Sequence, residues 1–328
     1  FHITPAERTY LDAYGHSADL AVLHYTVLRA LDYNPDFVLV APGLEQKDLQ
    51  KFWTQNPSFG LFTEVLVRVK TKEGDYWFND QDQYGQLGAC SLEGSLAYSL
   101  QTNKFFSLEV AEKMKSAKKQ IILIDMQSAG TAQITIRIQY FGEDIGIINK
   151  FYSELSPEEK RRHFQEMLTS LSQSAKALSD LTIDMEEYPG ILTFSAKVDD
   201  FAVVDENFCY FEFPDSLVNF LRPWGDSRSE ALFWNAKRNK FVEIAIRLPS
   251  DYRFPEICPE DFSWRSPSKQ GYVSIKRLKS SSKNELRYRM EAVLDAEIIA
   301  ADKYKEILKA NQIISHPAAR TILLKKRK

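Results

Sequence analysis

Ser17, Glu64 and Asn79 are the residues whose types and positions could support nucleophilic chemistry. A nucleophile at a helix N-terminus benefits from the helix dipole, and it needs a base and a third group that orients the base. Ser17 opens a predicted helix over 18–31, whereas Glu64 and Asn79 lie on a predicted hairpin. A serine hydroxyl has a pKa far above that of a thiol, and a surface carboxylate is a poor base at neutral pH. Because these residue types suit the chemistry poorly, we assign no catalytic residue from the sequence.

Each of these residues also has a structural interpretation. Ser17 is expected to be the N-cap of the helix, close to Asp19, whose charge suits the positive end of the helix dipole. Glu64 is expected to face solvent from a strand, with a pocket carboxylate for a cationic or hydroxylated ligand as the alternative. Asn79 is expected to form hydrogen bonds near a turn, where it could partner Glu64. The candidates for a ligand pocket are His16, Ser17, Asp19, Glu64, Trp77 and Asn79.

The hairpin that carries two of these candidates is predicted over 64–79, because apolar and polar residues alternate on both sides of a polar turn. If Lys70 pairs with Asp75 across the turn, the register makes Glu64 and Asn79 diagonal neighbours on one face. The hairpin should therefore present both side chains together.

The chain has 328 residues, which suits two domains, each with its own core. We expect an α+β first domain over 1–117 and a mainly antiparallel, sandwich-like β domain over 118–328. One helix, over 157–171, should interrupt the second domain, because Ser156 and Glu159 form a capping-box pattern around a proline at the first helical position.

The charge and the apolar runs exclude several classes of partner. The formal net charge is −3, so no overall field favours nucleic acid. The apolar runs are far shorter than the roughly 20 residues that cross a bilayer, so we expect no transmembrane segment in the visible chain. The chain has three widely spaced cysteines, Cys90, Cys209 and Cys258. This odd number and spacing match neither a disulfide framework nor a zinc site, and they favour buried thiols.

Metal and cofactor chemistry is not expected either. The acidic run over 80–82, with His16 and Asp19 as further ligands, lacks the glycine and the distal glutamate of a calcium loop. His24 lies on an apolar helix face and is expected to be a satisfied core histidine. The tryptophans favour core packing, with a stacking platform for a sugar or a peptide as the alternative.

Three segments of the first domain resemble the core of transglutaminase-like proteins. The motif over 15–19 resembles their Gly-x-Cys-x-Asp helix start, 62–65 resembles the strand that carries their histidine, and 76–79 resembles the strand that carries their aspartate. The resemblance continues in shorter matches over 83–88, 93–94, 156–159, 248–252 and 322–325.

More specifically, the chain is similar to a bacterial branch in which a domain of unknown function precedes the core and a β-rich domain follows it. The resemblance implies a papain-type fold for the first domain. It places the nucleophile at Ser17, the base at Glu64 and the orienting acid at Asn79, so the whole Cys, His and Asp triad is replaced. Because the sequence begins at Phe1, we expect a processed or truncated product that lacks the family's preceding domain.

The resemblance implies a non-catalytic protein that acts as a peptide- or glycan-binding module or as a scaffold, exported to the periplasm or envelope of a bacterium. One alternative is a surviving peptidase, amidase or acyl transferase that uses Ser17 with His16 or His24 as its base. Another is a purely structural envelope module in which the β-rich domain makes the contacts. The sequence leaves the identity of the ligand or partner open.

Overall fold

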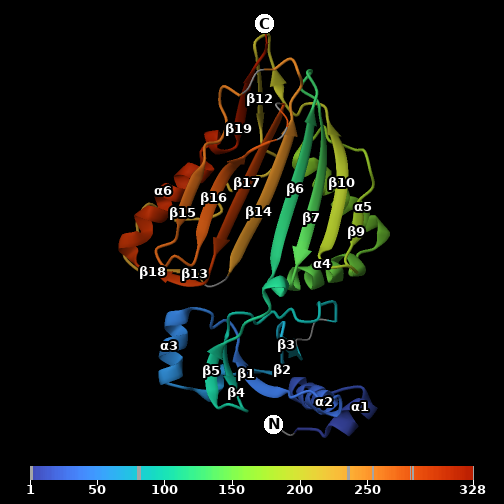
Figure 1. Ribbon diagram of the computed structural model, residues 1–328, viewed down its shortest axis with the longest axis vertical. Helices are drawn as coiled ribbons and strands as arrows, with labels where there is room; N and C mark the ends of the chain where they lie inside the picture. Colours follow the sequence, from blue (N-terminus) through green and yellow to red (C-terminus); the bar gives the residue numbers. More distant parts are fainter. Residues whose placement is uncertain are drawn as a thin grey trace. The chain divides into compact units, whose positions relative to one another are not determined.

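The computed structural model describes residues 3–79, 83–234, 237–252, 255–280, 282 and 284–327. The chain divides into two compact units. The first unit comprises the residues up to Ser116 together with Phe141–Lys150, and the second comprises Ala117–Tyr140 and the residues from Phe151 onward. Helices accompany mainly antiparallel sheets, so the chain is a mixed α+β protein, which confirms this part of the prediction (Figure 1).

The first unit is built on a five-stranded sheet in the order β3-β2-β1-β4-β5, in which all neighbours are antiparallel. Lys70 pairs with Asp75, so the predicted hairpin register is confirmed. The strands are β1 (Asp36–Ala41), β2 (Glu64–Thr71), β3 (Gly74–Phe78), β4 (Leu96–Ser99) and β5 (Lys104–Ser107). The helices of this unit are α1 (Ala6–Asp12), α2 (Ser17–Ala30) and α3 (Lys47–Gln55), with the short turns η1 (Phe59–Leu61) and η2 (Glu112–Met114).

Strand β2 separates two apolar clusters because its side chains alternate between the faces of the sheet. Val67 and Val69 pack with Ala21 and Leu28 of α2 on one face. Leu66 belongs to the cluster on the other face. That cluster also contains Val38, Val40, Trp77, Cys90, Ala97, Leu108 and Val110. Helix α2 is therefore fixed against a single, defined face of the hairpin.

A buried ion pair joins the middle strands of this sheet. The guanidinium of Arg68 on β2 lies 2.6 Å from the carboxylate of Asp36 on β1, and both side chains are almost completely buried. The hydroxyl of Ser99 and the backbone N–H of Gln101 also donate to Asp36, at 2.7 and 3.0 Å. The Arg68 guanidinium lies over the ring of Phe106 at 4.6 Å. The carboxylate of Asp75 lies 3.6 Å from the same guanidinium, whereas the Arg68 Nε has no hydrogen-bond partner among the described residues. Asp36 is thus the better satisfied member of the pair.

The second unit contains a nine-stranded sheet in the order β15-β16-β17-β14-β6-β7-β10-β8, with β9 also paired to β10. The pairing of β6 with β14 is parallel. These strands are β6 (Ala117–Met126), β7 (Ala132–Phe141), β8 (Lys176–Ala177), β9 (Thr182–Asp184), β10 (Gly190–Val198), β14 (Arg238–Arg247), β15 (Phe262–Arg265), β16 (Tyr272–Leu278) and β17 (Glu285–Leu294). Smaller sheets join β11 (Val203–Val204), β12 (Phe208–Glu212) and β19 (Thr321–Lys325), and β13 (Leu232–Trp234) and β18 (Glu297–Ile299).

Helix α5 (Pro157–Leu171) has the predicted bounds and the predicted start. The Ser156 hydroxyl accepts a hydrogen bond from the backbone N–H of Glu159, and the Glu159 carboxylate accepts one from the backbone N–H of Ser156. The helix lies over β10, because the rings of Phe164 and Phe194 meet edge to face at 5.6 Å. The other helical segments are α4 (Glu143–Glu154), α6 (Tyr304–Ser315), η3 (Ala301–Lys303) and η4 (Pro317–Ala319).

The structure differs from the sequence analysis in several elements. Helix α3 was not predicted, and its Gln50 side chain donates to the carbonyl oxygens of Leu44 and Gly94. Helix α4 was not predicted. Nine strands lie in one sheet, whereas a sandwich-like arrangement was expected. No helix of the described ranges is long and apolar enough to span a membrane.

Candidate functional site

The motif over 15–19 builds the start of α2, although its residues take roles other than those expected. The ring Nδ1 of His16 accepts hydrogen bonds from the backbone N–H groups of Ala18 and Asp19, at 3.2 and 3.4 Å. The Asp19 carboxylate accepts one from the backbone N–H of His16 at 3.1 Å, which completes a capping box. The prediction that Ser17 is the N-cap was therefore wrong. His16 is the cap, because its ring reaches the free amides, and Ser17 is the first helical residue.

Asp19 is a structural carboxylate with an exposed fraction of 3%. Its pKa is lowered, first by the hydrogen bond from the backbone N–H of Thr4 at 2.7 Å and further by the one from His16. Gly15 is needed beside it, since a Cβ atom there would lie 2.8 Å from the Asp19 Cβ and 2.8 Å from the Thr9 Cγ2. The glycine and the aspartate of the motif thus hold the helix start together.

Asn79 links the hairpin to this helix start. It follows the last residue of β3, has a left-handed backbone with φ of 81°, and is 7% exposed. Its side-chain nitrogen donates to the carbonyl oxygen of Ser17 at 2.7 Å and to that of Val65 at 2.6 Å. Both amide hydrogens are therefore used. The side-chain oxygen is buried and has no hydrogen-bond partner among the described residues.

Glu64 is not brought into this group. It is the first residue of β2, and strand alternation places its side chain on the face of Leu66, whereas Val65 faces α2. The expected face shared by Glu64 and Asn79 is not formed, because the left-handed backbone turns Asn79 toward Ser17. In the described part of the chain, no hydrogen bond joins Glu64 to either of the other two residues.

Ser17 has no base within reach in the described structure. Its hydroxyl forms no hydrogen bond with a described residue, and the Nδ1 of His16 is occupied by the helix amides. His24 lies on the same helix two turns further on, which is about 10 Å along the axis. The arrangement around Ser17 supports a helix start rather than proton transfer.

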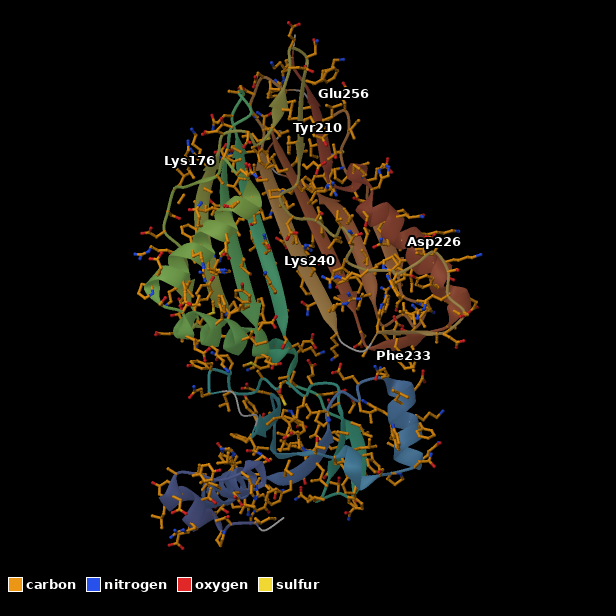
Figure 2. All side chains as sticks on the ribbon, turned by 180° about the vertical axis from the view of Figure 1, so that it is seen from behind. Lys176, Tyr210, Asp226, Phe233, Lys240 and Glu256 are labelled. Carbon is orange, nitrogen blue, oxygen red and sulfur yellow. The ribbon has the colours of Figure 1, made fainter. Side chains whose placement is uncertain are left out.

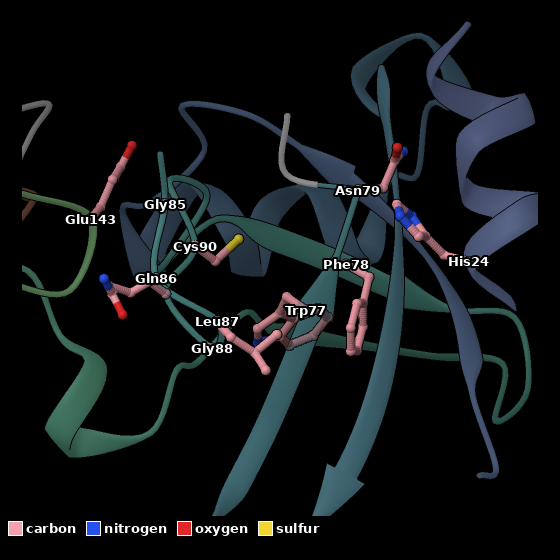
Figure 3. A pocket seen from close by; sticks show the side chains of 11 residues that line it. His24, Trp77, Phe78, Asn79, Gly85, Gln86, Leu87, Gly88, Cys90 and Glu143 are labelled. Atoms are coloured by element: carbon pink, nitrogen blue, oxygen red, sulfur yellow. The ribbon is translucent and has the colours of Figure 1, made fainter. Parts of the chain in front are cut away.

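A pocket of about 240 Å³ lies beside Asn79 (Figure 3). It is lined by His24 of α2, by Trp77, Phe78 and Asn79, by the loop over 85–90 and by Glu143 of α4. Trp77 and Asn79 are thus the predicted pocket residues that line it. The predicted residues that do not line it are His16, Ser17, Asp19 and Glu64.

His24 contributes the titratable ring of this pocket. The ring is half-buried, its Nδ1 has no hydrogen-bond partner in the described ranges, and burial lowers its pKa below the usual 6.5. The imidazole is therefore neutral at pH 7. The expectation of a satisfied core histidine is corrected, because the ring ends at the pocket between α2 and Phe78 rather than among bonded groups.

Trp77 and the loop over 85–90 form the rest of the wall. The indole N–H of Trp77 donates to the carbonyl oxygen of Glu109 at 2.9 Å, so Trp77 offers only apolar surface. Leu87 of the loop is 63% exposed. Sequence analysis gave this loop and His24 no role in the pocket. The glycines at 85 and 88 were a usable signal, since they allow a tight loop next to β3.

No group of three or more metal-ligating side chains occurs in the part of the chain that the structure describes. The acidic run over 80–82 lies outside that part, so the metal site considered there stays untested. Cys90 and Cys209 are buried and Cys258 is half-buried. Burial raises the pKa of the Cys209 thiol to about 11, so it is protonated at neutral pH.

The fold and the pocket define a mixed α+β protein with a small polar and aromatic pocket in its first unit. No protein-family model and no curated protein matches the chain. A crystal structure from Parabacteroides distasonis, described as a "putative protease", is similar with a TM-score of 0.48 and 9% sequence identity. The similarity covers 98% of this chain and 46% of that one, so this chain spans about half the length of that protein. Similarity of this degree does not establish a shared fold, and the transglutaminase-like core stays a prediction.

Proposed function

We propose that the chain is a non-catalytic, transglutaminase-like protein of the bacterial cell envelope, whose first unit binds a peptide or a glycan. The observation that carries this proposal is the pair of hydrogen bonds from Asn79 to the carbonyl oxygens of Ser17 and Val65. The Asn79 amide donates both of its hydrogens to backbone carbonyls, so it supports the fold. At this position the family resemblance places an acid that orients a base.

The surroundings of Ser17 and Glu64 support the same conclusion. Ser17 contributes its backbone carbonyl to this clamp, while its hydroxyl has no base beside it in the described structure. Glu64 belongs by strand alternation to the opposite face of the sheet. A serine without a base is a weak nucleophile, and the loss of both groups lowers the rate by many orders of magnitude.

The pocket beside Asn79 supports binding. Its volume of about 240 Å³ is below the roughly 300 Å³ at which pockets for drug-sized ligands begin, so it suits one side chain of a peptide or one sugar ring. Its wall combines the aromatic surface of Trp77 and Phe78 with the imidazole of His24 (Figure 3). Gln86 and Glu143 add polar groups to this wall, and aromatic surface beside placed polar groups is typical of recognition sites.

Catalysis is tested with the purified chain and its Ser17→Ala variant. We expect no hydrolysis and no transamidation of peptide amides above the uncatalysed rate in either protein. A turnover that the Ser17→Ala substitution abolishes would contradict the proposal, and it would favour the surviving-enzyme alternative.

Binding is tested by isothermal titration with muramyl dipeptide and with chitotriose, which represent the peptide and glycan classes. We expect one of them to bind, and we expect Leu87→Arg to weaken that binding because Leu87 lines the pocket. Leu100→Arg is the matched control, since Leu100 is a 47% exposed leucine of the same unit outside the pocket. Equal affinities of the two variants would contradict the pocket assignment.

The envelope location rests on the family resemblance. Fractionation of cells that make the protein, followed by detection with an antibody against this chain, tests it. Recovery in the cytosolic fraction would contradict this part of the proposal.

A further inference from the structure

A second cavity lies within the second unit, between helix α6 and the start of strand β15. Its volume of about 770 Å³ falls in the range of roughly 300–1,000 Å³ that is typical of ligand sites. Helix α6 runs beside β15, on the side away from β16, and the view from behind agrees (Figure 1, Figure 2). We call this cavity the α6 groove.

One face of α6 is turned to the groove. Lys309, Gln312, Ile313 and His316 line it, and their spacing places them on one stripe of a helix. A different stripe of α6 is buried in the unit and consists of Tyr304, Ile307, Ala310 and Ile314. The helix is thus anchored by one face, while the other face is available for binding.

Two isoleucines give the groove its apolar character. Ile257, from the loop before β15, and Ile313 of α6 both line it and are 46% and 47% exposed. Phe262 and Ile275, which pair across β15 and β16, add apolar surface below them. Two half-exposed aliphatic side chains in one cavity favour an aliphatic group of a ligand between them.

The polar groups of the groove differ between its walls. The α6 wall carries the ammonium of Lys309, and the loop wall carries the carboxylates of Glu260 and Asp261. The Asp261 carboxylate accepts a hydrogen bond from the backbone N–H of Arg277 at 2.7 Å. Lys309 and Glu260 form no ion pair with a described residue, since the neighbouring charged side chains pair elsewhere, Lys303 with Glu306 and Glu256 with Lys325. The Nδ1 of His316 accepts a hydrogen bond from the backbone N–H of Ala318, so the other ring nitrogen carries the hydrogen of the neutral ring and can donate it. A ligand with a carboxylate at one end and a cation at the other complements these walls.

Strand β15 adds a free backbone edge. It is the outermost strand of the nine-stranded sheet. The backbone N–H of Ser266 donates to the carbonyl oxygen of Gly271 at 2.9 Å, which fixes the alternation of the ladder, so the backbone groups of Ser263 and Arg265 point away from β16. No hydrogen bond to these outward groups is found in the described ranges. An exposed strand edge is a template for an extended chain.

We propose that the α6 groove binds an extended peptide segment. The segment places an aliphatic side chain between Ile257 and Ile313. It continues past Phe262, where the groove meets β15, and adds to the strand edge through the backbone groups of Ser263 and Arg265. Its acidic side chain meets Lys309, and a basic side chain meets Glu260. This site is separate from the pocket of the first unit, so it can fail or succeed independently of the function proposed above.

The test uses the full chain and a fluorescein-labelled hexapeptide, Lys-Thr-Val-Ile-Thr-Glu, within an array that varies the aliphatic residue and exchanges the two charges. Fluorescence anisotropy should show saturable binding. The Ile313→Lys substitution should weaken it by about tenfold or more, which corresponds to about 1.4 kcal/mol, because a charged side chain would replace the aliphatic one. Phe233→Lys is the matched control, because Phe233 is 55% exposed and lies far from Glu256, the neighbour of Ile257 (Figure 2).

Charge and backbone are tested separately. The Lys309→Glu substitution should weaken binding of the original peptide and should be rescued by a peptide with lysine in place of glutamate, while Lys305→Glu on the same helix should have no effect. A peptide with N-methyl groups on its two central amides should bind more weakly, because the central amide that faces β15 can no longer donate to it.

The proposal is overturned if no array member saturates the chain at about 1 mM, or if Ile313→Lys and Phe233→Lys have the same effect. It is also overturned if the N-methylated peptide binds equally well. If sedimentation shows that Ile313→Lys converts a dimer to a monomer, the groove holds a second copy of the chain, and the peptide assignment is wrong.

Discussion

The side-chain nitrogen of Asn79 lies 2.7 Å from the carbonyl oxygen of Ser17, and this hydrogen bond joins the end of the β2–β3 hairpin to the first turn of α2. The same nitrogen lies 2.6 Å from the carbonyl oxygen of Val65. Two acceptors on one nitrogen require two hydrogens, which an amide has and a carboxylate lacks. The position thus selects asparagine on structural grounds.

The first prediction concerns this amide. Asn79→Asp should destabilise the chain at pH 7 by about 2–4 kcal/mol, because a buried carboxylate would face two carbonyl oxygens without a hydrogen to donate. The folded state would raise the pKa of the new carboxyl above its unfolded value of about 3.9. The part of the penalty that comes from the charge is therefore full above the raised pKa and is lost below the unfolded pKa, where the protonated acid still lacks one of the two hydrogens. Urea unfolding at pH 7 and at acidic pH measures both effects.

The control for this prediction is Asn103→Asp. Asn103 also has a left-handed backbone, with φ of 54°, but it is exposed and its side-chain oxygen accepts a hydrogen bond from the Tyr98 hydroxyl. A carboxylate retains that acceptor, so this variant should lose little stability. Equal losses at the two positions would contradict the assignment of Asn79 as a clamp.

The second prediction concerns the glycine of the helix start. Gly15→Ala should destabilise the chain by about 1–3 kcal/mol, since the added methyl group would lie 2.8 Å from carbon atoms of Asp19 and Thr9. Gly60→Ala is the control, because among the described residues its added Cβ would come no closer than 4.0 Å to a neighbour, the Ser58 hydroxyl. Thermal unfolding of both variants gives the comparison. A Gly15→Ala variant as stable as Gly60→Ala would show that the helix start is loosely packed.

The sequence predicts local structure well where the pattern itself contains the cause. The capping box at Ser156 and Glu159 gave the bounds of α5, and the polar turn between Lys70 and Asp75 gave the hairpin register. Both features depend on neighbours in the chain. The sequence did not predict that His16 is the N-cap of α2. A histidine ring and a serine hydroxyl can both accept hydrogen bonds from the free helix amides, and the known N-cap preferences favour serine.

Features that depend on distant partners were not predictable. The parallel pairing of β6 with β14 joins strands more than a hundred residues apart, and alternation within a strand does not identify its partner. The Asn79 side chain turns toward Ser17 because its backbone is left-handed, whereas the predicted pairing continued a regular strand through this residue. The pocket combines His24 with a loop over 85–90, and its existence follows only from their packing.

The third prediction concerns the buried ion pair of the first unit. Arg68→Met alone should cost about 3–5 kcal/mol, because it leaves the Asp36 charge buried without its cation. Asp36→Asn should cost less, because the Asp75 carboxylate stays 3.6 Å from the Arg68 guanidinium. The double variant should cost less than the sum of the single variants by up to about 3 kcal/mol. The exposed pair of Lys113 and Glu73, at 2.7 Å, is the control and should contribute at most about 1 kcal/mol. Additive costs at Asp36 and Arg68 would mean that the two charges are independently solvated.

The last prediction is a pH dependence at His24. Burial lowers the pKa of its imidazole in the folded state below 6.5, whereas the unfolded chain keeps the ordinary value. Above pH 6.5 the ring is neutral in both states and contributes no pH dependence. As the pH falls below 6.5, the unfolded state takes up a proton that the folded state refuses, so the free energy of unfolding decreases until the folded pKa is reached. Replacing His24 with Gln should remove this decrease. Urea unfolding of the two proteins at pH 8, 7, 6 and 5 gives the free energy of unfolding at each pH, and the two curves should diverge only at the acidic values. Parallel curves over the whole range would place the His24 ring in water rather than at a buried pocket wall.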